Sequence, residues 1–296
     1  MSTLYSQGER YLRQILEHVS DAVVATDIHG RVTFSNPEAQ QLYGIAGEAA
    51  LGRSLSELLD MFDAGGESDV DAIAAIVAQH GHWKGELTQR ALDGRELLVE
   101  ASVSVLRDDD GTVLGSVSIL REISDRKEAE RQIVYQATHD GLTGLINRTA
   151  FLAELDVSIK AGRTPTLIFL DLNGFKVIND LHGHDRGDEI LGVIGGRLAG
   201  GLRAGDVAGR FGGDEFVVMA HDLTDPGVAN SYLARIMGLF GYPVMCRGGA
   251  SHAIGVSVGV AHSTLDDDPD GLIRRADKAM YEAKRSTEVS SAFRTA

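Results

Sequence analysis

Two adjacent carboxylates follow a double glycine in the segment Arg210-Phe-Gly-Gly-Asp-Glu-Phe216. The glycines, Gly212 and Gly213, permit a tight turn between two strands and let a ligand approach the main chain. Asp214 and Glu215 supply oxygen atoms, which hard divalent cations such as Mg2+ or Mn2+ prefer as ligands. The segment therefore indicates metal-assisted phosphoryl or nucleotidyl transfer.

A third acid, Asp171, lies near the end of a compact apolar strand that we expect over residues 166–172. Because it lies far from Asp214 in the sequence, both carboxylates can reach one ion only if their strands are neighbours in a sheet. A purely structural interpretation makes Asp171 a turn residue and Asp214-Glu215 an exposed hairpin tip. We favour the metal site because several related motifs accompany these acids.

The composition limits the class of protein. A chain of 296 residues fits two domains, each large enough to bury a core without disulfides. A net charge of −15 opposes broad binding to nucleic acid or anionic lipid, so any bound phosphate needs a local basic site. The single cysteine, Cys246, excludes an internal disulfide and agrees with a reducing compartment. Without a basic leader or an apolar run of about 18 residues, we expect no membrane segment and a cytoplasmic location.

The first part of the chain alternates short elements with turns. We expect a helix over residues 8–19, strands over 22–27 and 32–35, helices over 37–43 and 69–79, and strands over 83–91, 96–105 and 113–122. Asn36-Pro37 is typical of a helix start and Gly44 of its end. In the strand from residue 96, an alternating row of apolar residues predicts one buried face: Val99, Ala101, Val103 and Val105.

This order of elements resembles that of a PAS sensor domain over residues 8–123, with Ser35-Asn36-Pro37, Gly52-Arg53-Ser54 and Trp83-Lys-Gly-Glu86 at their usual places. The segment 121–127 resembles the exit of such a domain. We expect Ser124 to cap an amphipathic signalling helix over residues 124–138. One stripe of that helix carries Ala129, Ile133 and Ala137, which favours pairing with another helix.

From residue 139 onward, helices alternate with strands. The decapeptide from His139 to Arg148 and the Gly-Gly-Asp-Glu-Phe turn resemble motifs of the GGDEF family, the diguanylate cyclases, and the resemblance extends over residues 139–290. The predicted fold class is α+β: an N-terminal antiparallel sheet with short helices, a helical linker, and a C-terminal palm-like α/β sheet surrounded by helices.

The resemblance assigns the catalytic roles. It implies that Asp171 binds metal through its carboxylate and Leu172 through its carbonyl. Asp214 would be the second metal ligand and would assist deprotonation of the attacking 3′-hydroxyl, with Glu215 in a supporting role. Lys176 would neutralise charge on the phosphates as the transition state forms.

The same resemblance implies a GTP site. Asn179 and Asp188 match the guanine readers, and a carboxylate suits the N–H donors of guanine, which adenine lacks. The other implied substrate residues are Phe175, His184, Gly212, Gly213 and Lys284; His184 is equally compatible with packing. The sequence departs from the family at Glu288, where a basic residue is common, and the lost phosphate contact should weaken binding by about 1–3 kcal/mol. We therefore expect slower turnover rather than none.

Making a cyclic dinucleotide requires two GTP-loaded domains that face each other, so the resemblance implies a homodimer. The segment from Arg203 to Asp206 resembles the RxxD site at which cyclic di-GMP inhibits this family. An ordinary loop ion pair is the alternative, but the offset from Gly212 favours the inhibitory site. We therefore expect a GTP-dependent cyclase regulated by its PAS domain and inhibited by its product.

Two questions stay open at this level. The domain is also compatible with a catalytically weak or inactive receptor that binds GTP or cyclic di-GMP and signals through protein contacts, or with an inert passenger of a PAS dimerisation module. His80 and His82 flank the end of a predicted helix where a haem could bind, and Trp83 could line a flavin pocket. We expect no bound PAS ligand, because Trp83 lies in a strand start that is usual in PAS domains without cofactor.

Overall fold

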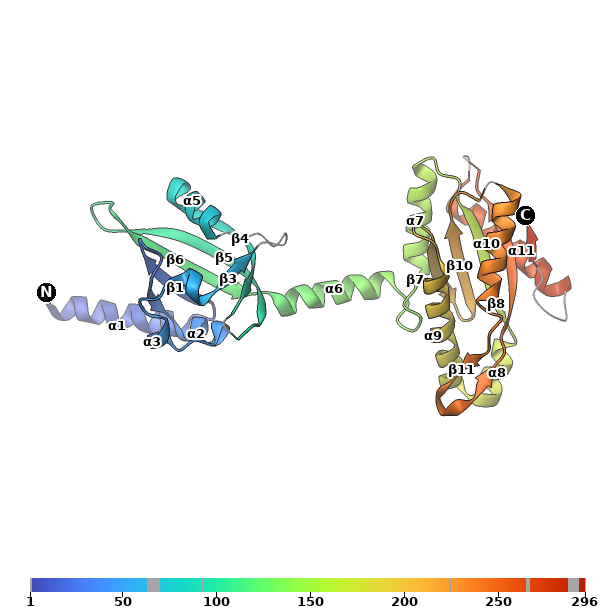
Figure 1. Ribbon diagram of the computed structural model, residues 1–296, viewed down its shortest axis with the longest axis horizontal. Helices are drawn as coiled ribbons and strands as arrows, with labels where there is room; N and C mark the ends of the chain where they lie inside the picture. Colours follow the sequence, from blue (N-terminus) through green and yellow to red (C-terminus); the bar gives the residue numbers. More distant parts are fainter. Residues whose placement is uncertain are drawn as a thin grey trace. The chain divides into compact units, whose positions relative to one another are not determined.

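The computed structural model describes residues 2–62, 70–91, 93–223, 225–264, 267–286 and 293–295. The chain divides into two compact units, Met1–Arg131 and Gln132–Ala296, and each contains a six-stranded sheet (Figure 1). No helix within the described ranges is long and apolar enough to cross a membrane.

The sheet of the first unit is antiparallel throughout, in the order β2-β1-β6-β5-β4-β3. Its strands are β1 (Ala22–Asp27), β2 (Val32–Ser35), β3 (Asp60–Phe62), β4 (His82–Arg90), β5 (Glu96–Arg107) and β6 (Val113–Glu122). The sequence did not predict β3, because three residues are too few to show an alternating pattern. The predicted alternation in β5 is confirmed: Val99 and Ala101 are fully buried, while Val103 and Val105 pack against the same core from partly buried positions.

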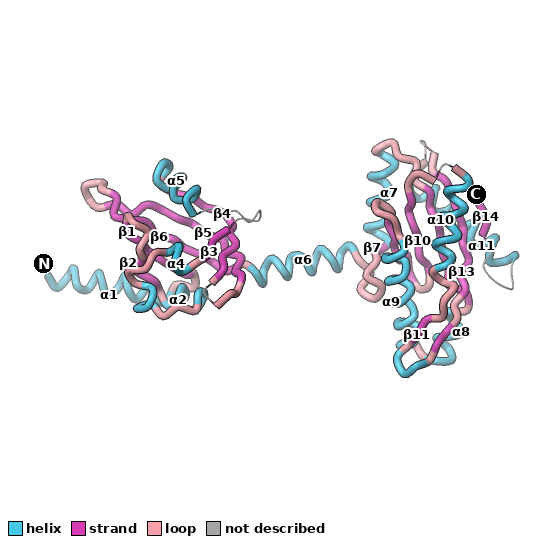
Figure 2. Tube along the Cα trace, in the orientation of Figure 1, coloured by secondary structure: helices cyan, strands magenta, loops and turns pink. Residues whose placement is uncertain are grey.

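Short helices lie between β2 and β4 in the chain (Figure 2). They are α2 (Pro37–Tyr43), α3 (Gly47–Ala50), α4 (Leu55–Leu58) and α5 (Val70–His80); α1 (Ser2–His18) precedes the sheet. The predicted bounds of α2 are confirmed, since Asn36 caps its first turn and Gly44 ends it in the left-handed region with φ +66°. Asp69, the predicted start of α5, lies outside the described residues.

Asn36 also ties several segments together. It is 1% exposed, and its side-chain oxygen accepts from the main-chain N–H groups of Val23 and Ala39, both at 2.9 Å. Its amide nitrogen donates to the carbonyls of Leu16 and Asp21. One buried side chain therefore satisfies main-chain groups from three parts of the chain.

The linker helix α6 (Ser124–Thr138) forms where the sequence predicts it. The predicted cap is wrong, however. The Ser124 hydroxyl accepts from the main-chain N–H of Leu98, and the N–H of Lys127 donates to the Ile123 carbonyl instead. The predicted stripe is exposed within this chain, with Ile133 at 66%.

The second sheet has the order β14-β13-β8-β10-β9-β7. Its strands are β7 (Ile146–Asn147), β8 (Thr166–Asn173), β9 (Val207–Gly212), β10 (Glu215–Ala220), β13 (Gly255–His262) and β14 (Phe293–Thr295), and β11 (Val244–Met245) pairs with β12 (Ser251–His252) in a separate hairpin. The four central strands are antiparallel, and the two edge strands are parallel to their neighbours.

Helices cover both faces of this sheet, as the buried residues of β8 show (Figure 1). Ile168, Leu170 and Leu172 share a core with α9 (His184–Gly201) and α10 (Pro226–Gly238). Leu167 and Phe169 share a second core with α7 (Arg148–Lys160) and α11 (Pro269–Ser286). A strand buried on both faces explains the continuous apolar run that the sequence shows. The predicted α+β fold class is confirmed.

Candidate functional site

The double-glycine turn joins β9 to β10 at the end of the sheet. Gly213 adopts φ +51°, in the left-handed region that favours glycine. On β10, Glu215 pairs with Asp171 of β8, and the N–H of Leu172 donates to the Asp214 carbonyl at 3.2 Å. The two acid-bearing segments are thus neighbours, as the metal-site interpretation requires.

Four acids surround this end of the sheet. Asp171 is 7% exposed, and burial raises the pKa of its carboxyl, as do the charges of Asp214 and Asp277, against the opposing effect of Lys284. Burial also raises the pKa of Glu215, and the charges of Asp277, Asp171 and Asp214 raise it further. Asp277, on α11, was missed by the sequence interpretation, because nothing in its spacing relates it to the distant strands.

Lys284 meets these acids from α11. Its Nζ lies 2.5 Å from Oδ1 of Asp171. The sequence predicts that Lys284 binds phosphate, and the structure places it at the acid that the sequence assigns to metal. The structure thus brings together, at one end of the sheet, the residues that the sequence assigns to metal and to phosphate.

The donor atoms fit a hard divalent cation such as Mg2+ or Mn2+. They are carboxylate oxygens of neighbouring strands. Burial first, and then the charges of neighbouring acids, raise the pKa values of Asp171 and Glu215, and a bound cation would offset this cost. Within the described ranges, no three His, Cys, Asp or Glu side chains are already arranged as a cage. Mg2+ typically takes one or two protein carboxylates and completes its shell with water and substrate phosphates.

Asn179 provides the second sign of a ligand site. It lies on α8 (Phe175–His182), and its side-chain oxygen is buried without a hydrogen-bond partner among the residues that the structure describes. A Cβ atom at Gly187 on α9 would lie 1.9 Å from that oxygen, so a larger residue there would require the Asn179 amide to move. Phe175 is buried beside the same glycine. Because buried polar atoms are rarely left unpaired, the Asn179 oxygen marks a position for a donor.

The remaining substrate residues lie on the same two helices. Lys176 is exposed in the first turn of α8, and His184 and Asp188 are exposed in the first two turns of α9. Glu288, where the sequence departs from the family, lies outside the described residues.

The predicted inhibitory site contains more than its two signature residues. The Arg203 guanidinium lies 4.9 Å from the ring centre of Tyr232, and that of Arg235 lies 4.8 Å from it. The Asp206 carboxylate accepts from the Tyr232 hydroxyl at 2.6 Å. Tyr232 and Arg235 were missed, because contacts across the fold leave no local signal in the sequence.

An ion pair between Arg210 and Asp140 supports the double-glycine turn from outside. Arg210 contacts both carboxylate oxygens of Asp140 through Nη1, at 3.1 and 3.0 Å. Its Nε and Nη2 donate to the Gly213 carbonyl at 3.1 and 2.8 Å. Burial opposes ionisation of Asp140, yet hydrogen bonds from Thr143 and Arg210 outweigh it and lower the pKa of the carboxyl. The sequence interpretation did not foresee this contact.

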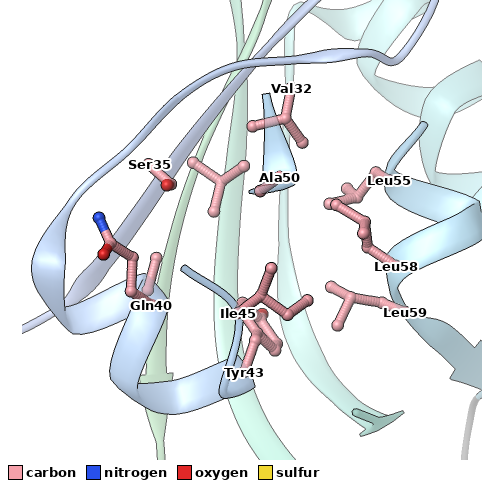
Figure 3. Close-up of a pocket in the computed structure, with 11 residues that line it drawn as sticks. Val32, Ser35, Gln40, Tyr43, Ile45, Ala50, Leu55, Leu58 and Leu59 are labelled. Carbon is pink, nitrogen blue, oxygen red and sulfur yellow. The ribbon is translucent and has the colours of Figure 1, made fainter. Parts of the chain in front are cut away.

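The first unit contains a small cavity between its sheet and the short helices (Figure 3). Its volume is about 20 Å³, and its lining is mostly apolar, from Val24 to Leu59. The Ser35 hydroxyl on this lining is buried without a hydrogen-bond partner within the described part of the chain. A space of this size holds about one water molecule.

The residues considered for a chromophore lie apart from this lining. His80 and His82 are exposed, and the Trp83 ring packs against Gly85 and the sheet core.

Fold and site together define a protein of two α+β units, the second of which gathers acidic side chains at one end of its sheet. The family described as "Diguanylate cyclase, GGDEF domain" matches residues 137–289, and the PAS fold matches residues 10–123. Because the first match covers more than half of the sequence, the chain belongs to the GGDEF family of diguanylate cyclase domains, preceded by a PAS fold.

Two curated relatives resemble nearly the whole chain. The cyclic di-GMP phosphodiesterase PdeB of Shewanella oneidensis is 30% identical over 96% of this chain and 33% of its own length. The probable diguanylate cyclase DgcE of Escherichia coli K12 is 29% identical over 95% of this chain and 26% of its own length. The chain thus spans a third or less of these two relatives.

Solved structures resemble the second unit. The coiled coil and GGDEF domain of DgcB from Caulobacter crescentus, in complex with c-di-GMP, is 30% identical, covers 57% of this chain and 93% of that chain, and has a TM-score of 0.51. The diguanylate cyclase SiaD of Pseudomonas aeruginosa, in complex with its activator SiaC, is 31% identical over 58% of this chain and 69% of that chain, with a TM-score of 0.50.

Proposed function

We propose that this protein is a diguanylate cyclase, which condenses two GTP molecules into cyclic di-GMP and two pyrophosphates. The pairing of Asp171 with Glu215 across β8 and β10 carries the proposal, because it brings Asp171 beside Asp214 at one end of the sheet. The buried side-chain oxygen of Asn179 has no hydrogen-bond partner within the described part of the chain, which supports a ligand site on the adjacent helices. The relatives named as diguanylate cyclases support the same activity.

Each group has a role in that reaction. Asp171, the Leu172 carbonyl and Asp214 would hold Mg2+ or Mn2+, which would polarise the phosphates when bound. Asp214 accepts the proton of the attacking 3′-hydroxyl, with Glu215 in a supporting role. Lys176 and Lys284 neutralise the charge that develops on the phosphates and the leaving pyrophosphate.

Base recognition follows from hydrogen-bond complementarity. Guanine presents N–H donors at N1 and at its 2-amino group, whereas adenine presents an acceptor at N1. The Asn179 oxygen and the Asp188 carboxylate are acceptors, so they select GTP over ATP. Phe175 and His184 border this position, and Gly212 and Gly213 let the nucleotide approach the main chain.

Regulation completes the proposal. Each domain holds one GTP, so the active form is a homodimer that brings two 3′-hydroxyls to two α-phosphates. The PAS domain (8–123) controls this geometry through the helix over residues 124–138, ahead of the cyclase domain (139–290). Cyclic di-GMP inhibits at Arg203 and Asp206. The single cysteine, Cys246, suits a reducing compartment and supports a cytoplasmic location.

The test incubates the purified protein with GTP and Mg2+ beside an Asp214→Ala control, after bound cyclic di-GMP is removed. Chromatography should show cyclic di-GMP and pyrophosphate with the unmodified protein alone. Product formation by the Asp214→Ala variant at the same rate would contradict the assigned base, and ATP consumption equal to that of GTP would contradict the base readers.

A second function is a receptor that binds GTP or cyclic di-GMP without turning it over. One observation favours it: a relative matching 96% of this chain is named as a cyclic di-GMP phosphodiesterase, so this two-domain arrangement also occurs in a protein named for the opposite activity. Calorimetry and chromatography test this function, with and without candidate PAS ligands. Nucleotide binding without any product in both conditions would support the receptor.

A further inference from the structure

The contacts of Arg210 join two parts of the second unit that the proposed function treats separately. One part is the double-glycine turn that carries Asp214, and the other is the segment directly after helix α6. Arg210 donates to the Gly213 carbonyl from two nitrogens and to the Asp140 carboxylate from a third. Its side chain is 14% exposed and that of Asp140 is 24% exposed. Solvent therefore screens this ion pair less than it screens a surface pair.

The turn needs an external support. Two consecutive exposed glycines leave its peptide groups free to rotate, because neither glycine has a side chain that restricts the backbone. From the β8 side, the Leu172 N–H holds the Asp214 carbonyl. From the other side, the planar guanidinium holds the Gly213 carbonyl, and its rigid fork fixes direction as well as distance. Together, these contacts set the direction of the Asp214 side chain.

The Asp140 end is equally well fixed. Its carboxylate also accepts from the main-chain N–H and the hydroxyl of Thr143, at 2.9 and 2.7 Å. The preceding residue, His139, stacks on Tyr135 of α6 with ring centres 4.1 Å apart and nearly parallel. A displacement at the end of α6 therefore reaches Asp140 through packed groups, and Arg210 passes it to the turn.

We propose that Arg210 is a positioning residue that aims Asp214 for catalysis and links its orientation to the end of α6. This proposal rests on the proposed cyclase function for its kinetic readout, but not for its metal-binding readout. Arg210 touches neither substrate nor metal in this role. It transmits the position of the linker helix to the metal-binding turn.

A matched control lies elsewhere in the same unit. Arg275 forms a bidentate pair with Asp267, at 2.6 and 2.8 Å, and also donates to the main-chain carbonyl of His262. It therefore repeats the chemistry of Arg210 at His262, the last residue of β13, away from the double-glycine turn. Lysine at either position keeps the charge and loses the fork.

The experiment compares Arg210→Lys and Arg210→Met with Arg275→Lys and Arg275→Met in the full chain. We expect the Arg210 variants to lower kcat about a hundredfold with KM for GTP nearly unchanged, because a small misplacement of a reacting group costs this much. Mn2+ binding to the nucleotide-free protein, followed by electron paramagnetic resonance, should weaken about tenfold. The Arg275 variants should lower only the midpoint of thermal unfolding.

If the Arg210 and Arg275 variants differ from the unmodified protein only in thermal stability, Arg210 is a structural residue and the proposal is wrong. If the unmodified protein forms no cyclic di-GMP, the proposed function fails, yet the Mn2+ comparison still decides the role of Arg210. Tyr135→Ala tests the link to α6. As a single substitution it should lower kcat, and added to Arg210→Met it should lower kcat no further. Additive losses of kcat in the double variant would refute the link.

Discussion

Two asparagines, one in each unit, show how differently the two halves of this chain use buried polar groups. Asn36 in the PAS unit makes hydrogen bonds to four main-chain groups and caps a helix. Asn179 in the GGDEF unit has a buried side-chain oxygen with no partner among the described residues. A satisfied amide stabilises the fold, whereas an unsatisfied one costs stability and is retained where a ligand can satisfy it.

The PAS unit also contains an exception that tests this distinction. The Ser35 hydroxyl, next to Asn36 in sequence, is buried without a partner in the described chain, like the Asn179 oxygen. It faces a cavity of about 20 Å³, which has room for about one water molecule. We therefore expect the Ser35 hydroxyl to contribute little to the free energy of unfolding and to bind no ligand larger than water.

The largest effect should come from Asp214→Ala. Removing the proposed base and metal ligand should lower cyclic di-GMP formation by about a hundredfold or more. The thermal midpoint should stay the same or rise, because one of four crowded acids disappears. Kinetics and differential scanning fluorimetry measure both quantities. A stability loss as large as the activity loss would place Asp214 among the structural residues instead.

The next largest effect should come from Asn36→Ala. Four hydrogen bonds to main-chain groups disappear, so the free energy of unfolding should fall by about 3 kcal/mol. Chemical denaturation followed by circular dichroism measures it. Asn36→Asp serves as a control, since it keeps both accepted hydrogen bonds and loses the donated ones. A loss below about 0.5 kcal/mol would remove the contrast with Asn179.

Asn179→Ala should show the reverse pattern. We expect unfolding free energy within about 0.5 kcal/mol of the unmodified protein, because no internal hydrogen bond to the side-chain oxygen is lost. Binding of GTP should weaken about tenfold, while binding of ATP changes little. Calorimetry with both nucleotides checks this. Equal weakening of GTP and ATP would show that Asn179 shapes the site without reading the base.

A smaller effect concerns a satisfied pair in the GGDEF unit. Hydrogen bonds from Arg275 lower the pKa of Asp267 below its ordinary value, against the opposing effect of burial. A carboxyl with a depressed folded-state pKa contributes stability above its unfolded pKa of about 3.9 and loses that contribution as pH falls through the folded value. Arg275→Met should therefore flatten the decline in unfolding free energy below about pH 4. An unchanged pH profile would contradict this assignment.

The smallest effect should come from Ser35→Ala. Removing a hydroxyl without an internal partner should change the unfolding free energy by less than about 0.5 kcal/mol. The same denaturation experiment measures it. A loss above about 1 kcal/mol would show that the Ser35 hydroxyl is satisfied in solution, and the comparison with Asn179 would then need revision.

Much of the fold follows from local sequence signals. Asn36-Pro37 and Gly44 predict both ends of α2, and the strand predicted over residues 113–122 is confirmed as β6. Local signals fail where the contact is distant. Ser124 looks like a helix cap, yet its hydroxyl accepts from Leu98 of β5, a partner that no spacing rule indicates.

The candidate site divides in the same way. Asp171, Asp214 and Lys284 were predicted through their motifs, and the structure brings all three to one end of the sheet. Asp277 and the Arg210–Asp140 pair were missed, because each depends on residues that only the sheet and its covering helices bring together. The resemblance thus identified the residues that belong to a sequence motif. The neighbouring residues that contact them could be found only from the three-dimensional structure.

The register that pairs Asp171 with Glu215 also constrains the order of assembly. Strands β8 and β10 are separated in the chain by α8, α9 and β9, so the two acids meet only after a long loop has closed. During synthesis, β10 must leave the ribosome before this pairing can form. A partly made chain therefore lacks the paired acids, and the proposed cation site is acquired only with the finished sheet.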